Sequence, residues 1–456
     1  MTKGKYKTYK KSDIPWLGDI PEHWEIRRIK YVFKEFNSRS ESGNEDLLSV
    51  SQYTGVTKKS DKVTVGENIS NAKTLEGYKL VERGDLVINI MLAWNGSLGI
   101  SPFNGITSPA YSVYRLIEGN EKYFGYLFRT PNAKQEFKKQ STGIIDSRLR
   151  MYTDSFFDVK TALPPIEEQT AIVNFLDYKL EKINRFIKKK KQLISLLTEQ
   201  KAAIINQAVT KGINPSVKLI PSGIEWLGEI PEHWQLNKLK YISSKIGDGI
   251  HTTPTYNIKG EIPFINGNNL TNNQIEITEK TNTVDFDEFQ KHKKELKNGT
   301  ILISINGTIG NLAIYRGEKV VLGKSAAFIE LIDTSYNQFL LYNLRTKYIN
   351  EYFISTFQGT TINNLSLKAI RNTSVIIPPK KEQDEIVQYI LTETDKVDKT
   401  ISTIEKEIEL VEEYKTALIV EAVTGKIDVR DFKLPRTEEL LAMVAEESTD
   451  YKIKSN

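Results

Sequence analysis

The sequence contains no cysteine. This absence excludes a disulfide framework and any metal site built on thiolates, and it suits a protein of the reducing cytoplasm. Histidine is nearly absent too, with four residues in 456. Because structural and catalytic zinc is bound largely by cysteine and histidine, we expect no metal site in this chain.

Long apolar runs are also missing. No stretch approaches the roughly 20 apolar residues that a membrane-spanning helix requires, so no membrane association is expected. The basic first residues have no apolar segment behind them, so no signal peptide is predicted. Charge is nearly balanced, since 63 basic and 58 acidic residues leave a formal net charge of +5. This balance permits nucleic-acid binding, which depends on a local basic surface, without establishing it.

Recognisable catalytic motifs are missing as well. Residues 317–327 look like a phosphate-binding loop, but five residues rather than four separate Gly317 from the Gly-Lys-Ser at 323–325. Lys324 and Ser325 are therefore expected on the surface of a strand or loop. No Asn-Pro-Pro-aromatic segment of adenine methylation and no acid/acid/lysine nuclease pattern stands out. The chain is predicted not to be an enzyme.

Several sequence blocks occur twice in the chain. DIPWLGDIPEHW at residues 13–24 returns as GIEWLGEIPEHW at residues 223–234, an offset of 210. LPPIEEQ and QAVTKGI, which begin at residues 163 and 207, return as IPPKKEQ and EAVTGKI at an offset of 214. Separated blocks that recur in one order are improbable by chance, so the chain is a tandem duplication. The histidines of the repeated PEHW, His23 and His233, are interpreted as capping or packing residues.

Two long stretches, Glu167–Val209 and Lys381–Val423, carry apolar residues at the two core positions of a heptad repeat. A register held for about five heptads is typical of helices that supercoil around one another. We predict an antiparallel pair of 43-residue helices, roughly 65 Å long at 1.5 Å per residue. Its core is assigned to Leu176, Leu180, Ile183, Ile187, Ile194, Leu197, Ile204, Ile390, Val397, Ile401, Ile404, Ile408, Val411 and Leu418. Three lysines at core positions, Lys190, Lys201 and Lys415, mark where the seam is weakest or where it meets another subunit.

The predicted fold class is α+β, with two mixed α/β globular domains separated by the two helices of an antiparallel coiled coil. Each globular block contains a β-rich apolar strand, a Gly/Asn/Ser loop and another strand, at residues 82–99 and 296–315. The expected boundaries are 1–162 and 214–377 for the globular domains, 163–213 and 378–426 for the spacer helices, and 427–456 for a C-terminal tail.

The loops of the two globular blocks differ strongly, and they are rich in residues that can contact DNA. Asn and Gln pair with adenine and Arg or Lys with guanine, whereas Ser and Thr bind phosphate or either base. The same residues are ordinary turn formers, so loop geometry alone is the competing interpretation at each position. The candidates are Ser51, Gln52, Tyr53, Asn89, Trp94, Asn95, Arg148 and Arg150 in the first block and Asp248, His251, Thr252, Asn266, Asn268, Asn269, Asn306, Thr308, Lys324, Thr360, Asn363 and Asn364 in the second.

The two WLG-x-IPEHW segments, the two Pro-Pro-x-x-Glu-Gln helix starts and IGDGIHTTP from Ile246 together resemble the specificity subunit of type I restriction–modification systems, the HsdS family. The resemblance covers about residues 13–426. It implies two target-recognition domains, each of which reads one half of a bipartite, asymmetric double-stranded DNA site. It also implies helices that set the gap between the halves, and two methyltransferase (modification) subunits and restriction/translocase subunits as partners. S-adenosylmethionine, ATP and Mg²⁺ are then expected on those partners, and no cofactor is expected on this chain.

Two other hypotheses stay open at this stage. A cryptic methyltransferase or nuclease is opposed by the missing motifs, and tight binding of S-adenosylmethionine would favour it. A coiled-coil scaffold that binds only protein would give no protection of DNA. The tail, with TEELLAMVAEES from Thr437, either docks on a neighbouring subunit or is a frayed terminus.

Overall fold

The computed structural model describes residues 4–62, 74–257, 259–271, 273–357 and 363–434. The fold class is α+β, and the chain divides into two compact units. Unit 1 comprises residues 1–190 and 406–456, and unit 2 comprises residues 191–405. The long helices α4 (Ile166–Lys211) and α10 (Lys380–Val423) each contribute one part to either unit.

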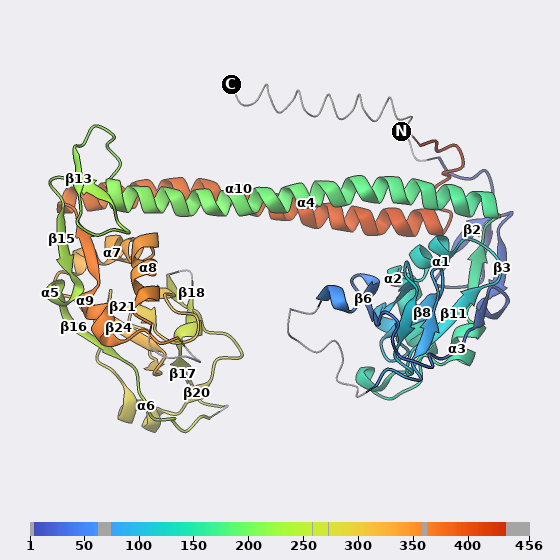
Figure 1. Cartoon of the computed structure of the whole chain (residues 1–456), viewed down its shortest axis with the longest axis horizontal. Helices are drawn as coiled ribbons and strands as arrows, with labels where there is room; N and C mark the ends of the chain where they lie inside the picture. Colours follow the sequence, from blue (N-terminus) through green and yellow to red (C-terminus); the bar gives the residue numbers. More distant parts are fainter. Residues whose placement is uncertain (1–3, 63–73, 258, 272, 358–362, 435–456) are drawn as a thin grey trace. The chain divides into compact units, whose positions relative to one another are not determined.

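Unit 1 is built from short antiparallel strands packed against helices (Figure 1). Its strands are β1 (Tyr9–Lys11), β2 (Asp19–Pro21), β3 (Glu25–Arg28), β4 (Phe33–Glu35), β5 (Leu48–Ser51), β6 (Gly55–Lys58), β7 (Lys79–Val81), β8 (Leu86–Ile88), β9 (Leu98–Ile100), β10 (Gly105–Thr107), β11 (Ser112–Leu116) and β12 (Lys160–Leu163). Its shorter α-helices are α1 (Glu121–Leu127), α2 (Pro131–Gln140) and α3 (Thr153–Asp158). The main sheet has the order β4-β11-β8-β9, and β3 pairs with β12.

Unit 2 has the same kinds of element. Its strands are β13 (Leu219–Pro221), β14 (Glu229–Pro231), β15 (Gln235–Lys238), β16 (Ser243–Asp248), β17 (Ile262–Ile265), β18 (Leu270–Thr271), β19 (Gln274–Ile275), β20 (Thr283–Val284), β21 (Ile301–Ser304), β22 (Leu312–Ile314), β23 (Val321–Leu322), β24 (Ala326–Leu331) and β25 (Ser374–Ile377). Its shorter α-helices are α5 (Leu239–Ile242), α6 (Phe286–His292), α7 (Asn337–Asn343), α8 (Lys347–Ser355) and α9 (Leu367–Asn372). The main sheet has the order β16-β24-β21-β22, and β15 pairs with β25.

The two units thus repeat one topology, as the duplicated sequence predicts. A four-stranded antiparallel sheet carries the core, and a two-stranded pair joins the opening segment to the strand just before the long helix. The predicted strand–loop–strand segments are β8 with β9 and β21 with β22, which pair antiparallel in both units. The unit 1 core is rich in aromatic rings, including Phe33, Phe124, Phe128 and Phe156, whereas aliphatic side chains dominate the unit 2 sheet.

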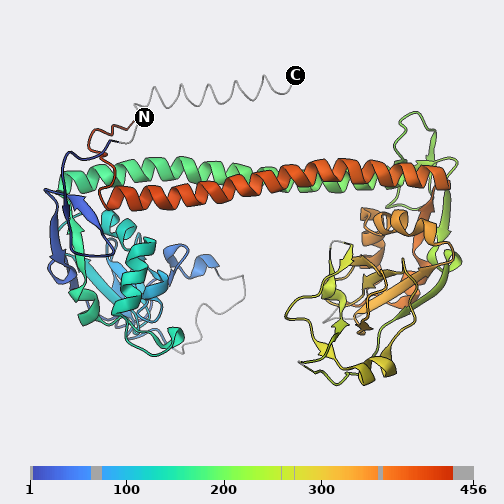
Figure 2. The ribbon, with the colours of Figure 1, turned by 180° about the vertical axis from the view of Figure 1, so that it is seen from behind.

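The long helices run antiparallel within each unit. In unit 1, Leu176 and Leu180 from the start of α4 share a buried cluster with Leu418 and Ala422 from the end of α10. In unit 2, the end of α4 shares a cluster with the start of α10, through Ala208, Val209 and Ile390 among others. Figures 1 and 2, which view the molecule from opposite sides, show the two helices side by side in both units.

The side chains assigned to the coiled-coil seam are buried or half-buried in every case. Seven of them are buried: Leu176, Leu180, Ile187, Ile390, Val397, Ile404 and Leu418. The seam lysines all have acidic partners. Lys190 Nζ lies 2.6 Å from Glu407 of α10, Lys201 Nζ lies 2.6 Å from Asp398 of α10, and Lys415 Nζ lies 3.4 Å from Glu412 on its own helix. Carboxylates of this chain therefore compensate these charges without another subunit.

Both long helices begin one residue before the predicted start, because the Pro-Pro-x-x-Glu-Gln segment organises their first turn. Gln169 Nε2 donates back to the carbonyl of Pro164 at 2.8 Å, and Gln383 Nε2 donates to the carbonyl of Pro378 at 2.7 Å. At the other ends, Gly212 has φ +77° and Gly425 has φ +71°, the left-handed conformation expected of a glycine that stops a helix.

The segment after α10 is part of unit 1 as far as it is described. Ile427 and Val429 are buried in the unit 1 core, and the Asp428 backbone N–H donates to the carbonyl of Gly4 at 2.8 Å. The first residues of the segment expected as a C-terminal tail, 427–432, therefore pack against the unit 1 core. Residues 435–456, with the segment from Thr437, lie outside the described residues.

Candidate nucleic-acid interface

In unit 2 the sheet topology brings the candidate loops to one edge. Because β16, β24, β21 and β22 are antiparallel neighbours, the end of β16, the start of β24, the end of β21 and the start of β22 lie at the same side of the sheet. The loops at this side are residues 248–252, 266–269, 304–311, 323–325 and 363–365, and we call them the unit 2 loop edge. Most of the unit 2 candidate residues lie on it.

Backbone hydrogen bonds join these loops to one another. The Ile250 N–H donates to the carbonyl of Leu322 at 2.8 Å, and the Ile305 N–H donates to the carbonyl of Ser325 at 2.9 Å. The Leu365 N–H donates to the carbonyl of Ile305 at 2.9 Å, which ties in the last loop. Segments more than a hundred residues apart in sequence therefore form one continuous surface.

Two glycines make this close approach of the loops possible. A Cβ added to Gly249 would lie 2.2 Å from the carbonyl oxygen of Gly323, and one added to Gly323 would lie 2.4 Å from Asn266 Oδ1. No side chain tolerates contacts this short. The sequence shows these residues only as turn formers, whereas the structure shows that they set the spacing between loops.

Several unit 2 candidates serve the loops themselves. Asn266 Oδ1 accepts from the Ser325 hydroxyl at 2.9 Å, and Asn269 Oδ1 accepts from the Asn266 N–H at 3.0 Å. Asp248 accepts from the ring of His251 at 2.8 Å. The competing interpretation, loop geometry, therefore holds for the side chains of Asn266 and Asn269.

The remaining unit 2 candidates differ in exposure. Asn306 is half-buried in an isolated backbone bridge to Asn364. The exposed ones are His251, Thr252, Asn268, Thr308, Lys324, Asn363 and Asn364. Thr360 lies outside the described residues. The exposed group combines amide, hydroxyl, imidazole and ammonium donors, which is the chemistry needed to contact base edges and phosphates. Lys324 follows β23 and lies on the surface, as expected.

Unit 1 has an equivalent edge, built from other residues. There the end of β8, the start of β9 and the turn between β5 and β6 lie together, because β8 pairs with β9 and Gly55 packs against Gly99. The Met151 N–H donates to the carbonyl of Ile90 at 2.9 Å, which adds the segment of Arg148 and Arg150. We call residues 51–55, 89–97 and 148–151 the unit 1 loop edge.

A half-buried arginine, Arg129, holds the turn of this edge. One Nη of Arg129 donates to the carbonyls of both Gln52 and Tyr53 at 2.9 Å, and burial lowers the pKa of Arg129. The Ser51 hydroxyl accepts from the N–H groups of Tyr53 and Thr54. The turn is therefore rigid, and it presents the Tyr53 ring, which is 83% exposed. Among the residues that the structure describes, this exposed ring is not packed into either core.

The other unit 1 candidates divide into structural and accessible residues. Asn89 is buried, donates to the Tyr111 hydroxyl and accepts from the Met91 N–H, so its amide is used inside the loop. Trp94 and Asn95 are half-buried, and Trp94 Nε1 donates to the carbonyl of Met91 at 3.2 Å. Arg148 is exposed, and Arg150 is half-buried.

Sequence reasoning missed the basic residues that accompany this edge from α2. Lys138 Nζ lies 5.0 Å from the centroid of the Trp94 ring, and Lys134 packs against Gly96. Burial, and then the charge of Arg129, lowers the pKa of Lys134. Arg129, Lys134 and Lys138 thus form a cationic group beside the unit 1 loop edge. The spacing of four residues between Lys134 and Lys138, which places them on one face of α2, was the available signal.

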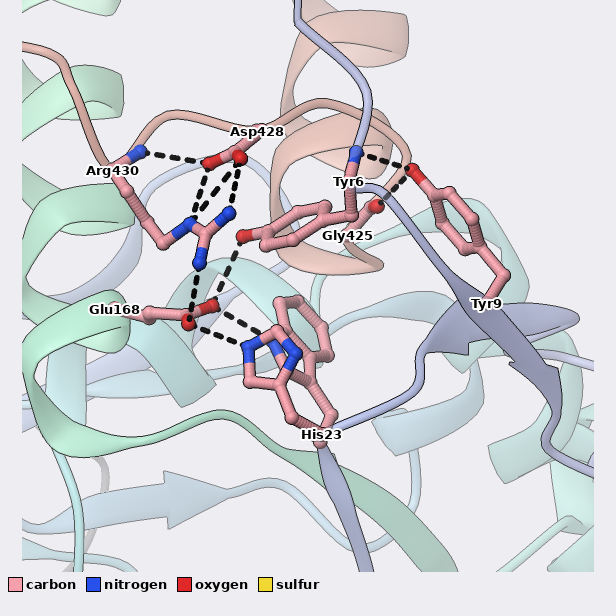
Figure 3. A network of polar contacts seen from close by, with 8 residues as sticks. Tyr6, Tyr9, His23, Glu168, Gly425, Asp428 and Arg430 are labelled. Carbon is pink, nitrogen blue, oxygen red and sulfur yellow. Dashed lines mark hydrogen bonds and ion pairs between the residues drawn. The ribbon is translucent and has the colours of Figure 1, made fainter.

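A different polar group fixes the base of unit 1 (Figure 3). Glu168, in the first turn of α4 and only 8% exposed, accepts from the Tyr6 hydroxyl at 3.1 Å and from Trp24 Nε1 at 2.9 Å. His23 Nε2 lies 2.6 Å from the same carboxylate, and Arg430 Nη1 lies 3.9 Å from it. Figure 3 shows side chains from the opening segment, α4 and the segment after α10 meeting at this carboxylate.

Unit 2 repeats part of this arrangement at Glu382. His233 Nε2 lies 2.7 Å from Glu382, and Trp234 Nε1 donates to it at 2.5 Å. The packing role expected for the two PEHW histidines is therefore explained, because His and Trp together hold the glutamate of the Pro-Pro-x-x-Glu-Gln segment. This pair of motifs links the opening segment to the long helix in both units. Within the described residues, no group of three or more His, Asp or Glu side chains is placed to hold a metal ion, and no helix is long and apolar enough to span a membrane.

Comparison with known proteins shows which proteins this chain resembles. The family model "Type I restriction modification DNA specificity domain" matches residues 231–413. The putative type I restriction enzyme MjaX specificity subunit of Methanocaldococcus jannaschii is 26% identical over 470 aligned residues, which cover 93% of this chain and 98% of that protein. Over nearly its whole length the chain is therefore similar to type I specificity subunits, the HsdS family.

Two further similarities also cover most of this chain. The type I restriction enzyme MjaVIII specificity subunit of the same organism is 25% identical, over 90% of this chain and 95% of that protein. A solved structure described as "Structural basis underlying complex assembly and conformational transition of the type I R-M system" shares the fold with a TM-score of 0.64. It is 17% identical and covers 89% of this chain and 98% of that chain.

Proposed function

We propose that this chain is the DNA-specificity subunit of a type I restriction–modification complex, in which each unit reads one half of a bipartite, asymmetric site through its loop edge. The observation that carries the proposal is the pair of equivalent loop edges. The topology beneath them is the same in both units, whereas the exposed residues differ, so two different half-sites are expected from one scaffold.

The chemistry of each edge supports direct reading of DNA. Unit 2 offers the exposed amides of Asn268, Asn363 and Asn364 and the ammonium of Lys324, which suit base edges and phosphates respectively. Unit 1 offers Tyr53, Arg148 and the lysines of α2, Lys134 and Lys138. Each of these side chains must be tested individually for a base contact, because loop residues can also serve the structure of the loop.

We further propose that the two target-recognition domains are separated by the antiparallel coiled coil of α4 and α10, which sets the gap between half-sites and docks two methyltransferase subunits. Support comes from the antiparallel contacts of the two helices within each unit. Two linked half-sites also raise affinity through effective concentration when both are engaged. In this proposal the methyltransferase and restriction/translocase partners carry out catalysis. Those partners also bind S-adenosylmethionine, ATP and Mg²⁺, and the whole complex acts in the cytoplasm.

A footprint on duplex DNA by the chain together with its methyltransferase tests the proposal. Protection of two short blocks separated by an unprotected gap is expected. Absence of protection would favour the alternative of a coiled-coil scaffold that binds only protein. A second assay addresses catalysis, since tight binding of S-adenosylmethionine by the isolated chain would indicate a methyltransferase instead.

A further inference from the structure

The two units differ at one apolar surface beside the long helices. In unit 1, Phe432 from the segment after α10 packs its ring edge-on against Phe175 of α4, with ring centroids 5.2 Å apart, and lies 5.6 Å from the ring of Tyr178. These contacts cover the first turns of α4. The residue of α10 equivalent to Phe175, at the offset of 214, is Tyr389.

In unit 2 the equivalent surface is uncovered. Tyr389 is 41% exposed, and no ring–ring contact is formed by it within the described residues of the chain. It lines a cavity of about 290 Å³ between the end of α4 and the segment that follows. At the offset of 214, the residue equivalent to Phe432 is Lys218. Its Nζ pairs with Glu232 at 2.7 Å and does not enter the cavity. The cavity walls include Gln200, Ala203, Ile204, Lys211, Leu219 and Tyr389.

We propose that this cavity binds an aromatic side chain carried by a peptide segment of a partner polypeptide. The class of occupant follows from unit 1, where Phe432, on the segment that follows α10, fills the equivalent place. We assign the ring to another polypeptide because the chain after α4 continues directly into β13, so the segment that follows α4 does not supply it. An edge-to-face partner for Tyr389 adds to the burial of the ring.

The charge of the residues that line the cavity indicates which partner segments can bind there. Of the residues that line it, all within the described part of the chain, Lys211 alone is charged, and it is exposed. The partner segment is therefore expected to carry an acidic residue next to its aromatic one. In unit 1 the position equivalent to Lys211 is Gly425, so this charge is particular to unit 2.

Fluorine NMR of a small probe tests the site on the isolated full-length chain, without DNA or methyltransferase. The probe is acetyl-Asp-(4-fluorophenylalanine)-amide, whose resonance should broaden and shift saturably as the chain is added. Unlabelled acetyl-Asp-Phe-amide should displace the probe, and acetyl-Asp-Ala-amide should not. Replacing Asp of the probe with Asn should weaken binding about two- to fivefold, the value of an exposed ion pair.

Two adjacent alanines of α4 provide a matched pair of variants. Ala203 lines the cavity, whereas Ala202 is exposed on the same helix outside it. Ala203→Trp should abolish the saturable signal and Ala202→Trp should leave it unchanged. Tyr389→Ala should weaken binding about two- to tenfold, the value of one aromatic pair.

Each other outcome overturns the proposal in a recognisable way. No saturable signal, or equal binding to Ala203→Trp and the parent chain, would show that the cavity holds no aromatic side chain. Binding of 4-fluorophenol as tight as that of the peptide would make it a site for small aromatic molecules. Binding only to a chain that ends at Leu434 would identify residues 435–456 as the occupant. A failure here leaves the DNA footprint untouched, so the two proposals fail separately.

Discussion

In both units a His–Trp pair contacts the glutamate in the first turn of a long helix, an arrangement that we call the clamp. The surroundings of the clamp differ between the units. In unit 1, Glu168 is buried beneath Tyr6 and Arg430, which come from the two opposite ends of the described chain. In unit 2, Glu382 has the His–Trp pair, and its side chain is 36% exposed. The reason is connectivity, since one continuous segment follows α4 in unit 2, whereas unit 1 must join two separate segments. In unit 1 the extra polar contacts of Tyr6 and Arg430 with Glu168 thus hold together two segments, whereas the corresponding segment of unit 2 is one continuous chain.

The loop edges differ in a parallel way. The unit 1 edge is held by a long side chain, that of Arg129, and the unit 2 edge by backbone contact at glycines. Gly249→Ala should therefore have the largest effect, destabilising unit 2 by about 4 kcal/mol because its Cβ would overlap two carbonyl oxygens. Protection of one half-site should be lost while the other remains.

The matching change in unit 1 is Arg129→Met, which removes two hydrogen bonds of about 1 kcal/mol each and should weaken only the opposite half-site. Footprints of both variants on one DNA duplex measure these effects. Loss of both half-sites from either variant would contradict independent reading by the two units.

The clamps can be compared by removing each glutamate. Glu168→Ala leaves the buried Trp24 Nε1 and Tyr6 hydroxyl without their acceptor and should lower the free energy of unfolding by about 3 kcal/mol. Glu382→Ala should cost about 1 kcal/mol, because fewer donors lose a partner and water reaches the site. Denaturant titration of the full chain measures both, and equal losses would show that the extra unit 1 contacts contribute nothing.

Two residues distinguish base reading from phosphate binding, the exposed Asn268 and the half-buried Lys134. Asn268→Ala should relax one position of one half-site at a cost of about 1–3 kcal/mol, whereas Lys134→Ala should weaken binding about equally on all sequences. The slope of log affinity against log salt should fall by about one for Lys134→Ala and stay unchanged for Asn268→Ala. Binding isotherms at several salt concentrations decide this, and sequence-dependent loss at Lys134 would assign it to base reading.

The smallest effect concerns alkaline stability. Burial, followed by the negative charge of Glu168, raises the pKa of Tyr6 well above its ordinary value. In the unfolded chain Tyr6 ionises near pH 10. Above about pH 10 the unfolded state therefore binds fewer protons than the folded state, and the free energy of unfolding falls as pH rises.

Tyr6→Phe should make that fall shallower, while it costs about 1 kcal/mol at neutral pH through the lost hydrogen bond to Glu168. Unfolding free energies from pH 8 to pH 11 provide the test. Unit 2 has Ser216 at the equivalent position, so Ser216→Ala serves as the control and should leave the slope unchanged. An identical slope for Tyr6→Phe and the parent chain would contradict the account.

The sequence was most informative where periodicity or repetition carried the signal. The long helices were predicted to within a residue at their starts, because proline pairs and heptad spacing are local features. The contact of His23 and Trp24 with Glu168 was not foreseen, although both motifs were visible, because Trp24 and Glu168 lie 144 residues apart in sequence and only the tertiary fold brings them together. Asn89, Asn266 and Asn269 show the limit of composition, since an amide that reads a base and one that caps a loop look alike until burial is known.

The most direct test of the central claim is methylation-site sequencing of a host that carries this chain with its methyltransferase, before and after residues 25–162 are exchanged for the equivalent block of a relative. We expect a bipartite site in which one half changes while the other half and the gap between them stay the same. A change in both halves, or no change in either, would contradict the assignment of one half-site to each loop edge.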